Sequence, residues 1–482
     1  MPALSSYVSG MEPEEFRRHG HAIVDWLADY YRDIESRRVV PDVQPGEIRA
    51  RLPAAAPEMA ESFDTVLRDF RELIVPGMSH WGHPGWFAYF PSHGSPPSVL
   101  GELLSAGLGA QCMSWETSPA ATELEQTVMS WYRQLLGLPH GFTGVIQDSA
   151  SGATLVAFLT ARERSGVDPS RAVAYWSTEA HSSIPKAARI AGIPISRRRI
   201  VPVGHDFAMQ PAALDQMMAE DQAAGLIPGI VVATMGTTSS TACDPLRPIG
   251  EIAQNRHAWF HVDAAYGGSA AILPEVRPLL DGVELADSMV TNPHKWLLTN
   301  FDCSAYFVRD VDALLRTFSI LPDYLRTRHD ANSTAVNFRD WGIPLGRRFR
   351  ALKLWFVLRS YGAERLRALI RNHIQLGHDL ASWVDAEPEF ERLAPAPLAL
   401  VCLRHVPPAL AGDETALAAH NAALLARVNA VGTVHLTHTT LAGRYAIRVA
   451  IGAFRTERRH VEEVWRLLRL AAGETRDERR ET

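Results

Sequence analysis

The stretch Ser288-Met289-Val290-Thr291-Asn292-Pro293-His294-Lys295-Trp296 carries the strongest indication of both fold and chemistry in this chain. Its short apolar start predicts a buried strand, and a lysine flanked by His294 and Trp296 follows at once. A lysine in a partly apolar site has a lowered pKa, and its neutral amine can attack a carbonyl. The chain has only three lysines, so the other candidates for such a role are Lys186 and Lys353. The simpler alternative is a surface lysine whose stem packs on apolar neighbours.

A carboxylate occupies a comparable position upstream. The run His261-Val262-Asp263-Ala264-Ala265-Tyr266 includes the end of a predicted strand over residues 259–264, and Asp263 falls near its carboxyl end. Ligands of open α/β sheets bind at such strand ends, where a carboxylate can keep a heteroaromatic nitrogen protonated. An aspartate that caps the next turn fits the local sequence equally well.

Two weaker patterns add an anion site and an imidazole. Small residues from Ser149 to Gly152 precede a predicted helix over residues 155–164, and free N–H groups at a helix start attract anions. His181 follows a predicted strand over residues 172–177 and could stack on a planar ring. Each pattern is common in purely structural settings. Together, an imine-forming lysine, a carboxylate, an anion site and a stacking ring are what pyridoxal 5′-phosphate requires.

The wider pattern predicts an α/β fold. Apolar strands are predicted at residues 172–177, 229–235, 259–264, 288–291 and 305–308, with helices at 211–224 and 248–257 between them. This alternation favours a mostly parallel sheet covered by helices. From residue 353 onward, long helices and two β-like runs at 398–403 and 445–451 indicate a smaller α+β domain. The N-terminal helix and the proline-rich segment after it have too little core of their own, so we expect them to lie on another surface.

Composition excludes several classes of protein. The chain has 482 residues, 46% of them hydrophobic, and a net charge of −6, which excludes whole-chain disorder and argues against nucleic-acid binding through a basic surface. The N-terminus lacks the pattern of a signal peptide, and no stretch predicts a membrane span. The cysteines lie far apart without a CxxC pair, which predicts reduced thiols in a cytoplasmic protein. They are Cys112, Cys243, Cys303 and Cys402.

A set of motifs spread from about residue 11 to residue 470 resembles the pyridoxal-phosphate-dependent aromatic L-amino-acid decarboxylases, within the group II decarboxylase family. The Asn-Pro-His-Lys-Trp run at 292–296 is the most specific of them. The other matching segments are 80–81 (HW), 87–91 (FAYFP), 118–120 (SPA), 122–125 (TELE), 145–147 (VIQ), 180–183 (AHSS), 236–238 (GTT), 261–266 (HVDAAY), 300–304 (NFDCS) and 344–350 (PLGRRFR).

The resemblance implies a fold type I enzyme that works as a homodimer. It implies an N-terminal helical arm at residues 1–95 that packs on the partner subunit. A large domain that binds the cofactor is expected at 96–352, and a small C-terminal domain at 353–482. The partners expected are the amino-acid substrate and a second copy of the chain, with no nucleic acid and no membrane.

The resemblance also assigns roles to residues. Lys295 matches the lysine that holds pyridoxal 5′-phosphate covalently, Asp263 the aspartate paired with the pyridine nitrogen, and His181 the histidine stacked on the ring. Tyr324 matches a catalytic tyrosine, and its segment, 319–337, is polar enough to predict a mobile loop. Asp244 matches an aspartate that supports the ring side of the site. The remaining cofactor-binding positions are Ala150, Ser151, Thr238, Asn292 and His294.

A substrate wall is implied as well. It consists of Trp81, Tyr89, Phe90, Ser92, Met113 and Gly346. Aromatic walls suit planar side chains, so the predicted reaction is decarboxylation of tryptophan, 5-hydroxytryptophan, dopa, tyrosine and phenylalanine to arylalkylamines and CO₂. Gly346 matches a position where, among plant relatives, glycine accompanies indole substrates and serine accompanies phenols. Gln111 adds a polar group that could bond an indole N–H or a phenol hydroxyl.

Three alternatives remain. An aromatic aldehyde synthase couples decarboxylation to oxygen-dependent deamination; such relatives usually lack the loop tyrosine or the stacking histidine, and this chain has both. A metal hydrolase could use His80 with His83, or His261 with Asp263, but no further ligands follow at suitable spacing, so no metal is expected. A catalytically silent protein on the same fold is disfavoured by the joint presence of the lysine, the aspartate and the histidine.

Overall fold

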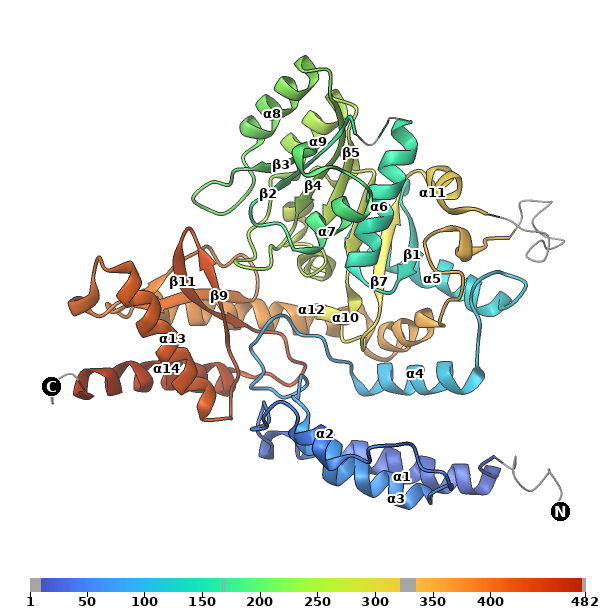
Figure 1. The fold of residues 1–482 in the computed structure, drawn as a ribbon, viewed down its shortest axis with the longest axis vertical. Helices are drawn as coiled ribbons and strands as arrows, with labels where there is room; N and C mark the ends of the chain where they lie inside the picture. The colour runs from blue at the N-terminus through green and yellow to red at the C-terminus, as the bar shows by residue number, and fades with distance from the viewer. Residues whose placement is uncertain (1–9, 167, 169, 321–334, 479–482) are drawn as a thin grey trace.

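The computed structural model describes residues 10–166, 168, 170–320 and 335–478. The predicted catalytic Tyr324 lies outside the described residues, as does most of its predicted loop. Within the described part of the chain, two separate sheets and the helices around them form the body of the molecule (Figure 1).

The larger sheet has seven strands in the order β1-β7-β6-β5-β4-β2-β3. Strands β3, β2, β4, β5 and β6 run parallel to one another, whereas β7 runs antiparallel to both β6 and β1. This confirms the predicted mostly parallel α/β sheet. The strands are β1 (Thr143–Gln147), β2 (Ala172–Ser177), β3 (Arg198–Val201), β4 (Ile227–Thr234), β5 (Trp259–Asp263), β6 (Ser288–Thr291) and β7 (Ser304–Val308).

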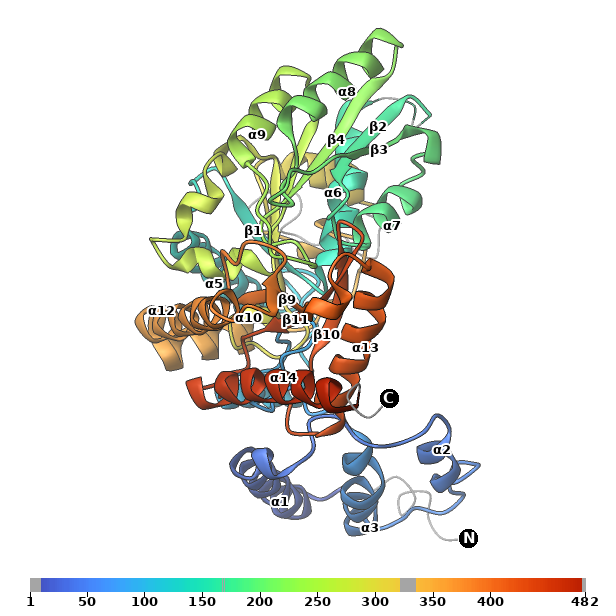
Figure 2. The ribbon, with the colours of Figure 1, turned by 90° about the vertical axis from the view of Figure 1, so that its left-hand side faces the viewer.

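Helices cover both faces of this sheet (Figure 2). On β4, Val231 and Ala233 join the core under α8 and α9, whereas Ile230 and Val232 join the core under α6, α7 and α11. A strand buried on both faces has a continuous apolar sequence, which explains why β4 could be predicted from the sequence. The helices of this region are α5 (Pro119–Leu136), α6 (Ala150–Ser165), α7 (Ser183–Ile190), α8 (Pro211–Ala223), α9 (Leu246–Asn255), α10 (Pro293–Trp296) and α11 (Val311–Phe318).

The smaller sheet is antiparallel, with strand order β10-β11-β9-β8. Helix α12 links it to the large sheet and changes direction at Gly362, whose φ of 68° is one that glycine adopts without strain. The predicted domain boundary at residue 353 falls within α12, and the division of the chain into domains remains a proposal. The elements are β8 (Phe390–Arg392), β9 (Leu400–His405), β10 (Thr437–Leu441), β11 (Arg444–Ala450), α12 (Arg350–Asp385), α13 (Glu414–Ala430) and α14 (Arg458–Glu478).

The N-terminal helices stand apart from the body in both views (Figures 1 and 2). The aromatic stretch that follows them packs on the small sheet of the same chain: Phe87 N donates to His435 O (3.0 Å) and Phe87 O accepts from Ala450 N (2.9 Å). No helix in the described ranges is both long enough and apolar enough to cross a membrane. These N-terminal helices are α1 (Pro13–Arg32), α2 (Glu47–Arg51) and α3 (Phe63–Asp69), whereas α4 (Pro96–Leu108) follows the aromatic stretch and packs on α12 of the body.

Candidate active site

A cavity of about 270 Å³ lies at the carboxyl ends of β4, β5 and β6, opposite the start of α6. This is the edge at which open α/β sheets bind ligands. The cavity brings together every predicted catalytic and cofactor-binding residue except Tyr324. Its walls are Phe90, Ser149, Ala150, Ser151, His181, Ser183, Thr234, Gly236, Thr238, Asp263, Ala265, Tyr266, Asn292, His294, Lys295 and Phe301.

Lys295 lies on the short helix α10, directly after β6. Its side chain is half-buried and its Nζ lies 5.4 Å from the centre of the Phe90 ring. Loss of water around the amine lowers the pKa of Lys295, and the negative charge of Asp263 partly opposes this. The environment therefore favours the neutral, nucleophilic amine.

Asp263 ends β5 and is buried. Its Oδ1 accepts a hydrogen bond from Ala265 N (3.1 Å), so this carboxylate does cap the next turn. In the described part of the chain no hydrogen bond is made to its Oδ2. The capping and ligand-binding interpretations of Asp263 are therefore compatible, one for each oxygen.

The start of α6 provides donors for an anion. Ser149 caps the helix by accepting from Gly152 N (3.0 Å), and the N–H groups of Ala150 and Ser151 have no acceptor among the described residues. The seryl oxygen is thus used internally, whereas two backbone donors face the cavity region. This pattern suits a phosphate group.

Asn292 and His294 each have one polar atom engaged and one left for a ligand. Asn292 Oδ1 accepts from Ser304 Oγ (2.6 Å), which orients its Nδ2 as a donor. His294 Nδ1 accepts from Cys303 N (2.9 Å), so the proton of the neutral ring is on Nε2. Burial lowers the pKa of His294 to about 3, which keeps the ring neutral. Both side chains therefore add hydrogen-bond donors to the cavity.

His181 is held by the first turn of α7. Its Nδ1 lies 2.8 Å from Ser183 Oγ and accepts from Ser183 N (3.1 Å). Burial, as the main cause, lowers the pKa of His181, although Asp263 opposes this. The ring is thus uncharged at neutral pH and fixed in orientation, as a stacking side chain requires.

Thr234 provides a test of whether a polar cofactor fits the cavity. Its Oγ1 is buried without a partner in the described part of the chain, and the residue lines the cavity. A buried hydroxyl without a partner is costly, so a ligand atom is expected there. Asp244 holds this residue in place, because its carboxylate accepts from Thr234 N and Met209 N (both 2.7 Å). Burial raises the pKa of Asp244 to about 6. The donors and this hydroxyl together fit a phosphorylated heteroaromatic ring.

A stack of aromatic rings forms one wall of the cavity. Phe90 stacks on Tyr266 with ring centres 3.8 Å apart, and Tyr266 stacks on Trp296 at 4.7 Å. Tyr266 and Phe301 were not among the predicted site residues, although both lie within the motifs at 261–266 and 300–304. Their position in those motifs was the signal that could have identified them.

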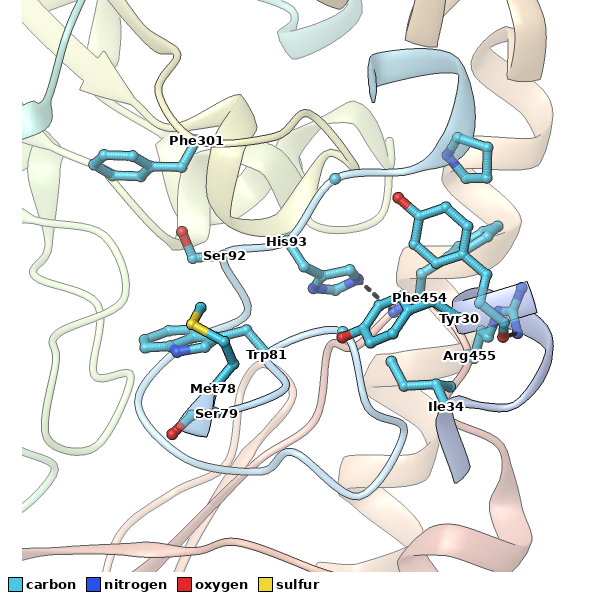
Figure 3. A pocket seen from close by; sticks show the side chains of 14 residues that line it. Tyr30, Ile34, Met78, Ser79, Trp81, Ser92, His93, Phe301, Phe454 and Arg455 are labelled. Atoms are coloured by element: carbon cyan, nitrogen blue, oxygen red, sulfur yellow. Dashed lines mark hydrogen bonds between the residues drawn. The ribbon is translucent and has the colours of Figure 1, made fainter. Parts of the chain in front are cut away.

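The predicted substrate wall is only partly assembled. Trp81 and Ser92 line a second cavity of about 560 Å³, and Phe301 lines both cavities (Figure 3). Phe90 belongs to the cofactor cavity. Tyr89 lines neither cavity and is exposed, but its ring stacks on Trp81 with centres 5.7 Å apart.

Met113 and Gly346 also line neither cavity. The backbone joins their two segments, because Cys112 N donates to Arg347 O (2.9 Å). In a single chain these two residues therefore form a separate group beside Gln111, whose Oε1 accepts from Arg347 N (2.7 Å).

The histidines considered as metal ligands have other contacts. His80 Nδ1 lies 2.9 Å from the Tyr30 hydroxyl, His83 Nδ1 accepts from Gly85 N, and His261 Nδ1 lies 2.9 Å from Ser288 Oγ. Across the ranges that the structure describes, no group of three or more His, Cys, Asp or Glu residues is arranged to hold a metal ion.

Comparison with known proteins agrees with this geometry. Residues 45–406 match the pyridoxal-dependent decarboxylase conserved domain. Phenylacetaldehyde synthase of Arabidopsis thaliana is 46% identical over 476 residues, which cover 96% of this chain and 97% of that protein. Aromatic-L-amino-acid decarboxylase of Sus scrofa is 43% identical over 485 residues, covering 96% and 97%. The crystal structure of Oryza sativa TDC with PLP and tryptamine aligns with a TM-score of 0.95 and 37% identity, covering 97% of this chain and 99% of that one.

These matches confirm the family resemblance, the fold type I architecture and the cofactor predicted from the sequence. The similarity extends over nearly the whole chain, and the predicted lysine, aspartate and histidine lie around one cavity. The chain therefore belongs to the pyridoxal-dependent decarboxylase family, as a carboxy-lyase that uses pyridoxal 5′-phosphate.

Proposed function

We propose that this enzyme decarboxylates aromatic L-amino acids, namely tryptophan, 5-hydroxytryptophan, dopa, tyrosine and phenylalanine, to the corresponding arylalkylamines and CO₂. The observation that carries the proposal is that two neighbouring cavities share one wall residue. Phe301 lines both the cavity that contains Lys295 and the larger aromatic cavity that contains Trp81 (Figure 3). A reacting amino acid at the first cavity can thus place an aromatic side chain toward the second.

Different residues of the first cavity would contact different parts of the cofactor. Lys295 would carry it through its amine, Asp263 would hold a proton at the pyridine nitrogen, and His181 would cover one ring face. The backbone donors of Ala150 and Ser151, with Thr238, Asn292 and His294, would surround the phosphate and the ring. When bound, pyridoxal 5′-phosphate supplies an electron sink for the bond to the departing carboxylate.

The second cavity supports an aromatic side chain rather than an acidic one. Its walls are mainly rings and aliphatic groups, including Tyr30, Ile34, Met78, Trp81 and Phe454, with Ser92 at the side toward Phe301. Apolar and stacking contacts favour planar groups. Arg455 is the only Lys or Arg among the described residues that line this cavity, and its guanidinium already faces Tyr31. We therefore expect glutamate and aspartate to be poor substrates.

An aromatic aldehyde synthase is the second candidate. The similarity to the Arabidopsis phenylacetaldehyde synthase is the observation that favours it. The joint presence of His181 and Tyr324 supports simple decarboxylation, with the tyrosine hydroxyl as the proton donor to the substrate Cα. The two activities differ in their products, because only the synthase consumes oxygen and releases aldehyde, ammonia and hydrogen peroxide.

The test is a substrate panel with complete product analysis. The purified enzyme, loaded with pyridoxal 5′-phosphate, is assayed on the five aromatic amino acids and on glutamate and aspartate, with CO₂, amine, aldehyde and peroxide measured. Amine equal to CO₂ supports the proposal, whereas aldehyde equal to CO₂ supports the synthase. A preference for glutamate over every aromatic substrate refutes both. Borohydride reduction and peptide mapping identify the lysine that holds the cofactor, and attachment at Lys186 or Lys353 would contradict the site.

We also propose a homodimer in which the N-terminal arm packs on the partner. Helix α4 exposes four leucines on one face, at spacings of three, one and four residues, and the nearby arm is poorly covered by its own chain. Sedimentation of the wild-type enzyme and of Leu104→Lys tests this, and an active wild-type monomer would contradict it. The leucines are Leu100, Leu103, Leu104 and Leu108.

A cytoplasmic location is proposed from the cysteines. All four are free thiols, and three of them are buried. Unpaired thiols are typical of a reducing compartment. Localisation of the tagged protein in its native cell provides the test.

A further inference from the structure

Arg448 is a buried arginine on β11 that faces the large domain. Only 4% of the residue is exposed, and within the described chain it forms no ion pair with a carboxylate. Its guanidinium instead donates to several neutral oxygens. The stronger of these hydrogen bonds run from Nη2 to Thr238 O (2.6 Å), from Nε to Ser239 O (3.1 Å) and from Nη1 to Thr437 Oγ1 (3.1 Å).

Two of these bonds hold the loop that contributes Thr238 to the cofactor cavity. The loop turns back on itself, because Gly236 N and Thr237 N both donate to Ala242 O (3.1 and 2.9 Å). Two more side chains of the small sheet bind the same loop, since the Cys402 thiol donates to Ser239 O (3.1 Å) and the Thr439 hydroxyl donates to Ser239 Oγ (3.1 Å). Arg448 therefore joins two successive carbonyls of the loop to the small domain.

The same guanidinium contacts the aromatic wall. Its central carbon lies 5.4 Å from the centre of the Phe90 ring, and Lys295 Nζ lies 5.4 Å from that same centre. Phe90 in turn stacks on Tyr266. One buried side chain thus contacts both the ring beside the reactive lysine and the loop that carries Thr238.

We propose that Arg448 is a positioning residue for decarboxylation, which sets the geometry of the cofactor cavity by fastening the small-domain sheet to Thr238 and Phe90. Arg448 does not line the cavity itself, so it acts through these two residues. The inference rests on the assignment of this cavity as the cofactor site. A planar guanidinium with five donors can bind several acceptors at once, whereas the single ammonium of lysine cannot reproduce this geometry.

The test compares Arg448→Lys and Arg448→Gln with a matched control, Arg444→Lys. Arg444 lies on the same strand but pairs with Glu391 (2.7 Å), away from the cavity. Both Arg448 variants should lower kcat by about 10²-fold, as expected for a small displacement of reacting groups, and should change KM far less. The affinity of the apoenzyme for pyridoxal 5′-phosphate should fall about tenfold, and the visible circular dichroism of the bound cofactor should change. The control should match the wild type.

The Arg448→Lys variant must also lose activity, because the proposal requires the shape of the guanidinium and not only its positive charge. Wild-type kcat, cofactor affinity and dichroism in Arg448→Lys would overturn it. So would losses that merely follow the folded fraction measured by urea unfolding.

If the Arg448 variants do not fold, the Thr437→Val variant tests the proposal instead. It removes the acceptor of Nη1 and keeps the charge, and it should lower kcat in the same direction; wild-type kcat and dichroism in this variant would overturn the inference. Failure of the wild type to bind the cofactor at Lys295 would instead refute the site assignment.

Discussion

Glu125 and Arg347 form a buried ion pair across 222 residues of sequence, with Glu125 Oε1 2.7 Å from Arg347 Nη2. Only 2% of Glu125 and 7% of Arg347 are exposed. Both residues also bind the same residue of β1: Ile146 N donates to Glu125 Oε1 (2.8 Å), and Ile146 O accepts from Arg347 Nη2 (2.7 Å). The pair thus joins α5, the edge of the large sheet and the segment that carries Gly346.

Replacement of Glu125 by Gln should destabilise the fold. The substitution keeps the shape but leaves the Arg347 guanidinium buried without its counter-charge, which costs about 3–5 kcal/mol in the free energy of unfolding. Urea unfolding of the holoenzyme measures this. Glu463→Gln, which removes the surface partner of Arg466, is the control and should cost clearly less. Equal losses in the two variants would contradict the importance of burial.

Replacement of Asp263 by Asn should shift the pH dependence of cofactor attachment. The neutral amine of Lys295 is the reactive form, and the Asp263 carboxylate raises the pKa of that amine. Without this charge the pKa falls further, so the attachment rate reaches its half-maximum at a lower pH. Visible absorbance of the apoenzyme mixed with pyridoxal 5′-phosphate at several pH values follows this. Turnover should also fall by about 10²–10³-fold. A midpoint that stays the same or rises would show that Asp263 does not act on Lys295.

Replacement of Tyr324 by Phe should change the product and leave cofactor binding intact. Without the hydroxyl, protonation of the substrate Cα slows by about 10²-fold, and the carbanion reacts with oxygen instead. One amino acid, one O₂ and one water then give aldehyde, CO₂, ammonia and hydrogen peroxide. Assays of hydrogen peroxide and amine measure the ratio of oxidative deamination to simple decarboxylation. Tyr361→Phe serves as the control. Amine at the parental rate without aldehyde would mean that another group supplies the proton.

Replacement of Gly346 by Ser should narrow the substrate range. A Cβ at this position would lie 3.2 Å from Gln111 Nε2, and Gln111 is anchored through its bond from Arg347 N. Gly346 lines neither cavity of the single chain, so the expectation rests on the family position that it matches. A larger side chain there should lower kcat/KM for tryptophan by about tenfold relative to tyrosine. Gly141→Ser, where an added Cβ meets no atom within 4 Å, is the control. An unchanged ratio of tryptophan to tyrosine would remove Gly346 from the substrate site.

The amide of Gln111 also bears on this specificity. Oε1 accepts from Arg347 N, but an amide oxygen has two lone pairs and the Nε2 amide group has two N–H donors. Gln111 therefore keeps both an acceptor and a donor for a ligand, and the prediction that it can bond an indole N–H or a phenol hydroxyl stays a prediction.

The sequence by itself determined the parts of this protein that depend on neighbouring residues. Strands β2 and β6 have the predicted bounds, and every residue of both strands is buried. Lys295 follows β6 and Asp263 ends β5, so their arrival at one sheet edge follows from the parallel order of the strands. By contrast, β3 was not predicted, because two of its four residues are arginines, and the strand forms through its pairing with β2.

Only the tertiary structure decided which distant segments complete the site. Phe90 meets Lys295, and Arg448 reaches Thr238 from the small sheet, across separations of about 200 residues in sequence. The structure also placed Met113 and Gly346 apart from the two cavities, which the motifs alone grouped with Trp81. Contacts of this kind arise when packed elements bring buried charges and rings together, and neither local propensity nor hydrophobic period contains that information.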